Sequence, residues 1–345
     1  MDLCEDAYNT TSNPIIITVW IGLIIQNILS IFGLFVITYF LIKYKFYHLH
    51  LRTLICGLHF AFLIRTFGTT YRGFDFLLKL IFKNNNNCNL LQNKSYCMII
   101  SSINGSSIGA FLYTFAAISI ERIFASVFYK VYEIHSFILL PFLAIILIWI
   151  QPVIKIYNTL SNPLLWKMTE KLSYCNSFTT KQADPILFFK TDFPICLVVF
   201  LLNISIYLYC KYRLKSIDDI KLIDNRLTIK FELKEILSST LLITILGIFY
   251  TIDLIINTII VYLISIKEYK SNKTFAIDKE LSAYVIPVYI LLYIGVFISL
   301  SNKIKQKIIG IFCKSRRIAT IKKNAVLPST NEVEKYFQIY NNTWA

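Results

Sequence analysis

Hydrophobic runs long enough to cross a bilayer recur along the chain, separated by short polar segments. A bilayer core of about 30 Å needs roughly 20 mostly apolar residues in a helix. Seven runs have close to this length, and the alternation typical of membrane strands is absent. The pattern predicts an all-α membrane protein with a seven-transmembrane helix bundle, whose spans are residues 15–42, 49–71, 96–120, 136–154, 193–210, 236–266 and 281–302.

The composition indicates the same class of protein. Of the 345 residues, 56% are hydrophobic and 16% charged, and the mean hydropathy is +0.60. An average soluble domain is about 45–50% apolar and about 25% charged, so a water-soluble globule is excluded. With 10 glycines and 8 prolines, the chain is neither disordered nor collagenous.

The net charge of +15 is interpreted first as a topology signal, and no nucleic-acid partner is expected. Residues 1–14 carry acids but no basic residue, unlike the start of a signal peptide. An odd number of spans puts the termini on opposite sides of the membrane, and 21 of the 35 Lys and Arg residues then share the side of the C-terminus. The positive-inside rule therefore predicts an extracellular N-terminus over 1–14, a bundle over 15–302, and a cytoplasmic helix and tail over 303–345.

Lysines alternate with isoleucines directly after the last run. Lys303, Lys305 and Lys307 border an apolar face that begins with Ile304. This spacing predicts a short amphipathic cytoplasmic helix on the anionic leaflet, with membrane lipids as partners. Cys313 at its end is a candidate palmitoylation site. The alternative is a basic flank that only stops transfer through the membrane.

The predicted outer segments carry candidates for modification. Glycosylation sequons begin at Asn9, Asn93 and Asn272. Four cysteines allow three pairings, and their spacing does not choose among them. The cysteines on this oxidising side are Cys4, Cys88, Cys97 and Cys175.

No catalytic set is present in the sequence. The chain has four histidines and lacks the HExxH, GxSxG and glycine-rich phosphate motifs. The ionisable residues well inside the runs are His59, Arg65 and Asp253, which are too few for an intramembrane hydrolase. We therefore expect no enzyme activity, no cofactor and no metal site.

Arg65 and Asp253 lie at a similar depth in the outer half of the predicted bundle. A charge at membrane depth costs at least about 2.5–3.5 kcal/mol and usually faces a cavity. We predict an outward-facing ligand pocket where the two charges can pair, with Asn257 one turn beyond Asp253. Asn104 completes the candidate ligand-binding set, although polar residues in that run are more typical of helix packing. Alternatively, Arg65 extends to the headgroups and backbone groups satisfy Asp253.

The third run ends at the segment ERIFASVFYKVYE, residues 121–133. Its adjacent acid and base follow directly on the apolar stretch, where charges at a membrane edge are also common. The segment resembles the ER-x-x-A…YE signature of the nematode serpentine chemoreceptors. The matching residues are Glu121, Arg122, Ala125, Tyr132 and Glu133.

Other segments are similar to the same family, in the same order along the chain. Residues 227–237, LTIKFELKEIL, resemble its LSxRYQxxEN element, in which Glu235 matches and Lys230 is a conservative change. The first loop, KYKFYHLH with His48, and the pair Tyr174-Cys175 are also similar. The resemblance favours the alpha-beta class over its epsilon sibling.

The resemblance covers roughly residues 15–314 and implies a rhodopsin-like, G protein-coupled chemosensory receptor in the plasma membrane of sensory cells. Such a receptor binds an external small molecule or peptide in the outer half of the bundle. It signals to a heterotrimeric G protein through the inner ends of its third and sixth helices. The coupling residues implied are Glu121, Arg122, Lys230 and Glu235, with Glu121 as the resting partner of Arg122.

The resemblance also implies a disulfide between Cys97 and Cys175, with Cys4 and Cys88 as a weaker second pair. Three features depart from the wider rhodopsin-like receptors. The sixth run contains neither the tryptophan nor the proline of their switch. Ile123 stands where they have a tyrosine after the arginine, and the last run contains no NPxxY. Activation therefore need not follow the rhodopsin details.

A seven-span ligand-gated channel or a small-solute transporter is the alternative function. Insect-type ligand-gated receptors have seven spans with the N-terminus inside. A seven-span transporter should have related halves, and the sequence contains no such repeat.

Overall fold

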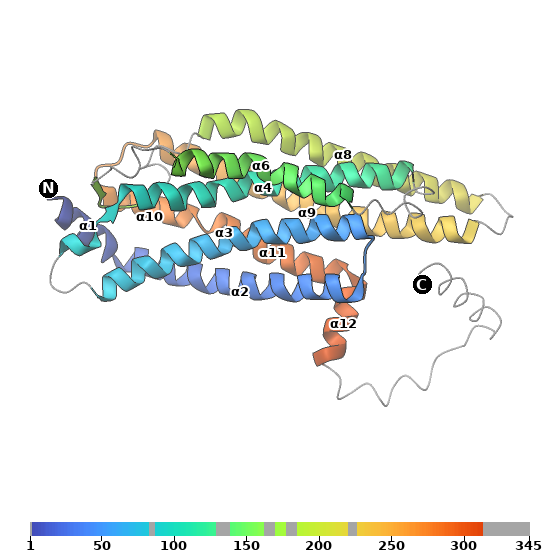
Figure 1. Ribbon diagram of the computed structural model, residues 1–345, viewed down its shortest axis with the longest axis horizontal. Coiled ribbons are helices and arrows are strands. Elements are labelled where there is room, and N and C mark those ends of the chain that lie inside the picture. Colours follow the sequence, from blue (N-terminus) through green and yellow to red (C-terminus); the bar gives the residue numbers. More distant parts are fainter. Residues whose placement is uncertain are drawn as a thin grey trace. The chain divides into compact units, whose positions relative to one another are not determined.

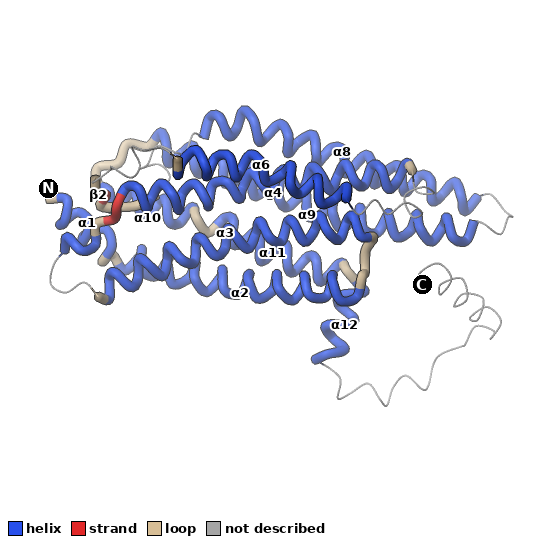
Figure 2. The backbone as a smooth tube through the Cα atoms, viewed as in Figure 1, coloured by secondary structure: helices blue, strands red, loops and turns tan. Residues whose placement is uncertain are grey.

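The computed structural model describes residues 2–82, 87–128, 139–161, 170–176, 185–219 and 226–312. Residues 1–301 form one compact unit and residues 302–345 a second. Helices dominate the described residues (Figures 1 and 2). The elements are α1 (Leu3–Thr11), α2 (Pro14–Tyr44), α3 (Leu49–Ile81), η1 (Asn87–Leu90), β1 (Gln92–Asn93), α4 (Lys94–Val127), α6 (Leu139–Leu160), β2 (Lys171–Leu172), α8 (Pro185–Asp219), α9 (Arg226–Ile266), α10 (Asn272–Ser282), α11 (Val285–Leu300) and α12 (Asn302–Phe312).

Seven segments are long and apolar enough to cross a membrane, so the predicted seven-helix bundle is confirmed. Five of them are α2, α3, α4, α6 and part of α8. The sixth is Lys234–Ile266 within α9, and the seventh is Asn272–Leu300, which combines α10 and α11. The predicted helix after the last span is α12, on which Lys305 and Lys307 are exposed.

The seventh span differs from its prediction because it begins at Asn272 and bends between α10 and α11. At the bend, the amides of Ala283 and Tyr284 donate to carbonyls only three residues back. Pro287 explains the bend, since it has no amide proton and its ring crowds the carbonyl four residues earlier. Glu280, which sequence analysis left in a loop, consequently lies inside the span.

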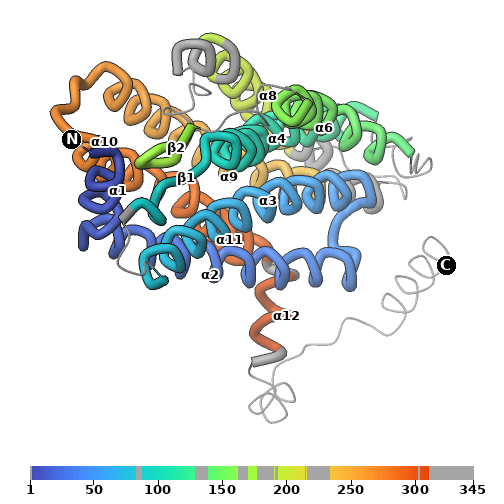
Figure 3. The backbone as a smooth tube through the Cα atoms, turned by 60° about the vertical axis from the view of Figure 1, so that its left-hand side comes forward, coloured from blue at the N-terminus to red at the C-terminus, as the bar shows by residue number. Residues whose placement is uncertain are grey.

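The interior of the bundle is arranged around α4, which packs against α3, α6, α8 and α9 (Figure 3). α2 packs on the other side of α3 and alongside α11. In the apolar window of α4, 56% of residues are buried, against 17% for α6, whose large apolar side chains face outward. A bilayer is the environment that this outward apolar surface requires.

The two ends of the bundle differ in construction. The bonds Cys4–Cys88 and Cys97–Cys175 lie at one end, which we call the disulfide end. The small antiparallel sheet of β1 and β2, with Gln92 opposite Leu172, is at the same end (Figure 3). Arg122, near the C-terminus of α4, marks the opposite end, which we call the Arg122 end. The helices α2, α4 and α11 run from the disulfide end, and α3 and α9 run towards it.

Local signals explain where the first helices begin and end. The side chain of Asn13 accepts a hydrogen bond from the amide of Ile15, and Pro14 occupies the first turn, as is usual at a helix start. Lys45 adopts the left-handed conformation, with φ of 47°, and ends α2. His48 then caps α3 through its imidazole.

Trp20 and Gly73 bring α2 and α3 together near the disulfide end. The Trp20 ring stacks on Phe76 with centroids 5.6 Å apart. A Cβ atom added to Gly73 would lie only 2.9 Å from Cε3 of Trp20 and 3.0 Å from Cγ1 of Ile24. The rigid indole ring cannot bend away from an added methyl group. The close contact between α2 and α3 therefore requires glycine at position 73.

Gly73→Ala should therefore destabilise the protein by about 1–3 kcal/mol through overpacking. The measurement is the melting temperature of the purified, detergent-solubilised protein. Gly247→Ala is the matched control, since a Cβ on Gly247 of α9 would meet nothing within 4 Å. Equal melting temperatures for the two variants would contradict the predicted contact.

Candidate functional site

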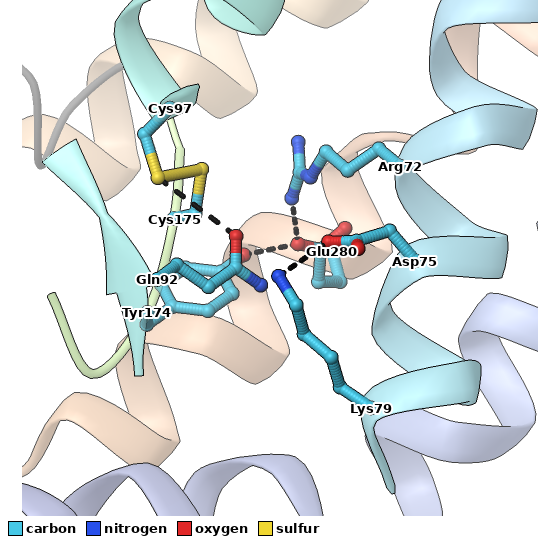
Figure 4. Close-up of a disulfide and its surroundings, with 8 residues drawn as sticks. All are labelled: Arg72, Asp75, Lys79, Gln92, Cys97, Tyr174, Cys175 and Glu280. Atoms are coloured by element: carbon cyan, nitrogen blue, oxygen red, sulfur yellow. Dashed lines mark hydrogen bonds and ion pairs between the residues drawn. A yellow bond between two sulfur atoms is a disulfide. The ribbon is translucent and has the colours of Figure 1, made fainter. Parts of the chain in front are cut away.

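Cys97 at the start of α4 is joined to Cys175, which follows β2 (Figure 4). Their Cα atoms are 5.5 Å apart, and both side chains are buried. This is the pair that the resemblance implied, and the second bond joins Cys4 to Cys88. The segment preceding Cys175 is therefore held against the end of α4.

Glu280 on α10 accepts hydrogen bonds from Arg72 of α3 and from the hydroxyl of Tyr174 (Figure 4). The side chain of Glu280 is 1% exposed. The guanidinium of Arg72 also lies 4.8 Å from the Trp20 ring centroid, a cation–π contact with α2. Burial, and then the neighbouring Glu280, raise the pKa of Tyr174 well above its usual value, so its hydroxyl remains a donor. We call these four side chains the Glu280 cluster.

Sequence analysis missed Glu280 because its charge suggested a loop. Ala276 and Glu280 are four residues apart and lie on one buried face of α10, but the sequence alone does not show that this face is buried. A carboxylate on a buried face requires a cationic partner.

Arg65, Asn104 and Asp253, which we call the polar layer, lie on α3, α4 and α9. Nη1 of Arg65 donates to the backbone carbonyl of Asn104 at 3.0 Å. Arg65 and Asp253 interact electrostatically, but no direct ion pair joins them among the described residues. The predicted direct pairing is thus not seen. Asn257 is half-buried one turn beyond Asp253, and no described residue hydrogen-bonds its side chain.

An aromatic cluster, the aromatic layer, lies next to the polar layer on the side of the Arg122 end. Phe62 packs 4.8 Å from Phe111 and 6.0 Å from Tyr289, measured between ring centroids. Phe115 stacks on Tyr250 at 5.0 Å, and Tyr250 contacts Tyr289 at 5.5 Å. Phe62 and Tyr250 each precede a charged residue of the polar layer by one turn of helix.

His59 connects three helices on the side of the aromatic layer that is nearer the Arg122 end. Its Nδ1 is 2.7 Å from the hydroxyl of Thr38 on α2, and its Nε2 is 2.8 Å from the hydroxyl of Tyr293 on α11. Both ring nitrogens are therefore satisfied by neutral partners, as a buried imidazole requires. The side chain is 1% exposed, which indicates a packing role.

Arg122 and Glu121 form a buried ion pair at the opposite end of the bundle. Nε and Nη2 of Arg122 donate to the two carboxylate oxygens of Glu121, each at 2.5 Å. Nη1 donates at 2.8 Å to the hydroxyl of Ser239 on α9. The same hydroxyl donates towards the carbonyl of Glu235 at 3.0 Å, one turn earlier in α9. Arg122 thus links α4 to α9.

His48, the cap of α3, lies near this ion pair. Its Nδ1 faces the amide of His50 at 3.5 Å, and Glu121 and Arg122 act on it electrostatically. Burial first, and then the neighbouring His50, lower the pKa of His48 from 6.5 to about 4. His48 is therefore neutral at pH 7.

The remaining predicted residues are placed in part. Asn93 and Asn272 are exposed, and Nδ2 of Asn272 donates to Asp6 at 2.6 Å. Asn9 is half-buried within α1. Cys313 and the side chain of Lys230 lie outside the described residues. Among the residues that are described, no group of three or more His, Cys, Asp or Glu side chains could hold a metal ion.

Comparison with known protein families matches residues 5–345 to the family described as "Serpentine type 7TM GPCR receptor class ab chemoreceptor". The match covers nearly the whole chain, including the Glu280 cluster, the polar layer and the Arg122 ion pair. No curated protein sequence gives a significant match.

Glu280→Gln keeps an acceptor for Tyr174 but removes the charge that pairs with Arg72. Breaking one side of a buried ion pair should cost about 3–5 kcal/mol, seen as a lower melting temperature and poor surface expression. Replacing both charges, in Arg72→Met with Glu280→Met, should cost less than the single change. Lys267→Ala, which removes the exposed partner of Asp278, is the control and should cost at most about 1 kcal/mol. If Glu280→Gln lowered the melting temperature no more than Lys267→Ala does, the prediction would be contradicted.

The neutral His48 predicts acid sensitivity. The unfolded chain binds this proton near pH 6.5 and the folded chain only near pH 4, so stability should fall as the pH drops from about 6.5 towards 4. His48→Asn retains a good cap without a titrating ring and should flatten this part of the melting temperature profile. Profiles of equal slope for wild type and variant would count against His48.

Proposed function

Because the chain belongs to the class ab serpentine seven-transmembrane chemoreceptors, a family of G protein-coupled receptors, we propose that it binds an external chemical cue and signals to a heterotrimeric G protein. The resemblance stated from the sequence is confirmed, including the preference for the alpha-beta class. The ligand would bind in the half of the bundle nearer the disulfide end, and the G protein would bind at the Arg122 end.

The proposed orientation puts the disulfide end outside the cell. Disulfides persist in oxidising compartments, and both bonds lie at this end. The exposed sequons at Asn93 and Asn272 lie at the same end, as sites for glycans would. The C-terminus would then be cytoplasmic, in agreement with the distribution of Lys and Arg.

The contact that carries the proposal for coupling is the hydrogen bond between Arg122 and Ser239. It joins α4 to α9 at an end where side-chain contacts, and no disulfide among the described residues, hold the helices. If α9 moved away from α4, Arg122 would lose this partner and its charged face would open towards a partner protein. Such helix shifts are a common form of switching.

The helix α9 also supplies the proposed connection between ligand and G protein. It carries Asp253 and Tyr250 in the ligand half and Ser239 at the Arg122 end. Asp253 and Ser239 are separated by about 21 Å along one unbroken helix. A ligand that binds more tightly when α9 is in one arrangement than in another would therefore shift the equilibrium between the formed and broken Arg122 contact. The size of that shift is limited by the difference between the two affinities.

Ser239→Ala should raise signalling in the absence of ligand. Loss of a hydrogen bond to a charged group shifts an equilibrium by about 1.5–3 kcal/mol, which corresponds to at least about a tenfold change in the population of the open state. The measurement is the basal second-messenger level, normalised to surface receptor, in cells that express matched G proteins. Adding Arg122→Ala should abolish the increase per receptor at the surface; the normalisation is needed because this change leaves the buried Glu121 without its cation and should also lower expression.

Ser205→Ala on α8 is the matched control, since the exposed Ser205 hydroxyl donates only to Leu201 of its own helix. The same basal level in wild type and both serine variants would argue against the Ser239 contact as a restraint. Unchanged signalling in the Arg122→Ala receptor would argue against the coupling role of Arg122.

A further inference from the structure

Arg65 and Asp253 are opposite charges that interact electrostatically, and among the described residues no hydrogen bond or ion pair joins them. The guanidinium of Arg65 donates through Nη1 to a backbone carbonyl, and its Nε is buried without a partner. No described residue hydrogen-bonds the carboxylate of Asp253, although the charge of Arg65 acts on it. An ion held in a protein interior without a contact partner is costly, so each of these groups is suited to a partner from outside the chain.

The neighbouring charges do not supply those partners. Glu280 accepts its hydrogen bonds from Arg72 and Tyr174. The charges that interact with Arg65 are Asp253 and, as like charges, Arg72 and Lys279. Arg65 therefore lacks an anion at contact distance, and Asp253 lacks a cation.

Asn104 adds an acceptor to the polar layer. Its Oδ1 is buried without a partner. It approaches α3 at Gly68, where an added Cβ would lie 2.2 Å from that oxygen. The layer thus offers guanidinium donors on α3 and acceptors on α4 and α9.

The aromatic layer borders the polar layer on the side of the Arg122 end. Phe62 and Phe111 are buried, and the buried hydroxyl of Tyr289 has no hydrogen-bond partner among the described residues. Rings packed edge to face offer an apolar surface to a ring or an aliphatic chain. A ligand that lies between the two layers would meet charges at one end and aromatic rings at the other.

We propose that the receptor takes a small zwitterion, whose carboxylate binds Arg65, whose ammonium binds Asp253 and Asn104, and whose aromatic or apolar body packs on the aromatic layer. This inference rests on the proposed function, in that it names the class of the ligand. A ligand with only one charge leaves either Arg65 or Asp253 without a partner. Its binding free energy then includes the cost of keeping that unpaired charge buried. Selection by unpaired polar groups is the strongest form of discrimination that a binding site can apply.

The test uses purified receptor and four amino acids as probes: phenylalanine, tyrosine, leucine and glycine. Each is compared with its own acid lacking the amine and its own amine lacking the carboxylate. Affinities come from ligand-induced shifts in melting temperature and from calorimetry. At least one amino acid should bind at least about tenfold tighter than both of its single-charge analogues. If none of the four exceeds both analogues, the inference is overturned.

Variants separate recognition of the two charges. Asp253→Asn should lower the affinity for the amino acid at least about tenfold. It should leave the affinity for the acid analogue unchanged or higher. Arg65→Met should weaken the amino acid and leave the amine analogue unchanged. Asp278→Asn, an acid outside both layers that pairs with the exposed Lys267, is the control and should change no affinity. Equal weakening of all three probes by Asp253→Asn would indicate a structural role and overturn the inference.

Folding and signalling are measured separately. The melting temperature without ligand checks that each variant folds, and if Arg65→Met does not, the wild-type comparison and Asp253→Asn decide. Binding needs no G protein, so amino acid binding without a second-messenger response would refute the proposed coupling and leave this inference standing. A receptor that signals through a G protein but binds the single-charge probes more tightly than the amino acids would refute this inference and leave the proposed coupling standing.

Discussion

Glu280 places a carboxylate where water does not reach, and an anion in such surroundings must be held by donors from the protein. Its partners come from α3 and from the segment that the Cys97–Cys175 bond fixes, while Trp20 of α2 covers the guanidinium of Arg72. Any displacement of these elements would leave the buried carboxylate of Glu280 without its hydrogen-bond donors. The disulfide end is therefore held by covalent, ionic and aromatic contacts at once, and the rest of the bundle extends from it.

The Arg122 end is held more lightly. Among the described residues it contains no disulfide, and α4 meets α9 through the hydrogen bond from Arg122 to Ser239 and through a small apolar cluster that includes Ala125 and Ile236. Between the two ends, some side chains are satisfied within single helices, such as Thr114, which donates to Ala110 in α4, while His59 links α2, α3 and α11. A bundle fixed at one end and lightly linked at the other can change shape at the second end at little cost to the first.

The spans and the Arg122 ion pair could be predicted from the sequence because each depends on neighbours along one helix. Hydrophobic runs of bilayer length identified the helices, and Glu121 and Arg122 are adjacent. Contacts between helices could not be predicted so well. Arg65 and Asp253 were expected at a similar depth, and they interact electrostatically, but their separation depends on how far α3 stands from α9, which no local pattern encodes. Glu280 was missed for a related reason, since only the positions of Arg72 and Tyr174 make a buried carboxylate tolerable there.

The two disulfides close separate stretches of chain, residues 4–88 and 97–175, and neither loop encloses the other. A ribosome delivers both cysteines of the first pair before either cysteine of the second. During biosynthesis the correct partner of Cys4 is thus the first thiol to reach the same compartment, and the same holds for Cys97 once the first pair is closed. With the disulfide end on the oxidising side, as proposed, the order of synthesis favours the native pairing over the two alternatives.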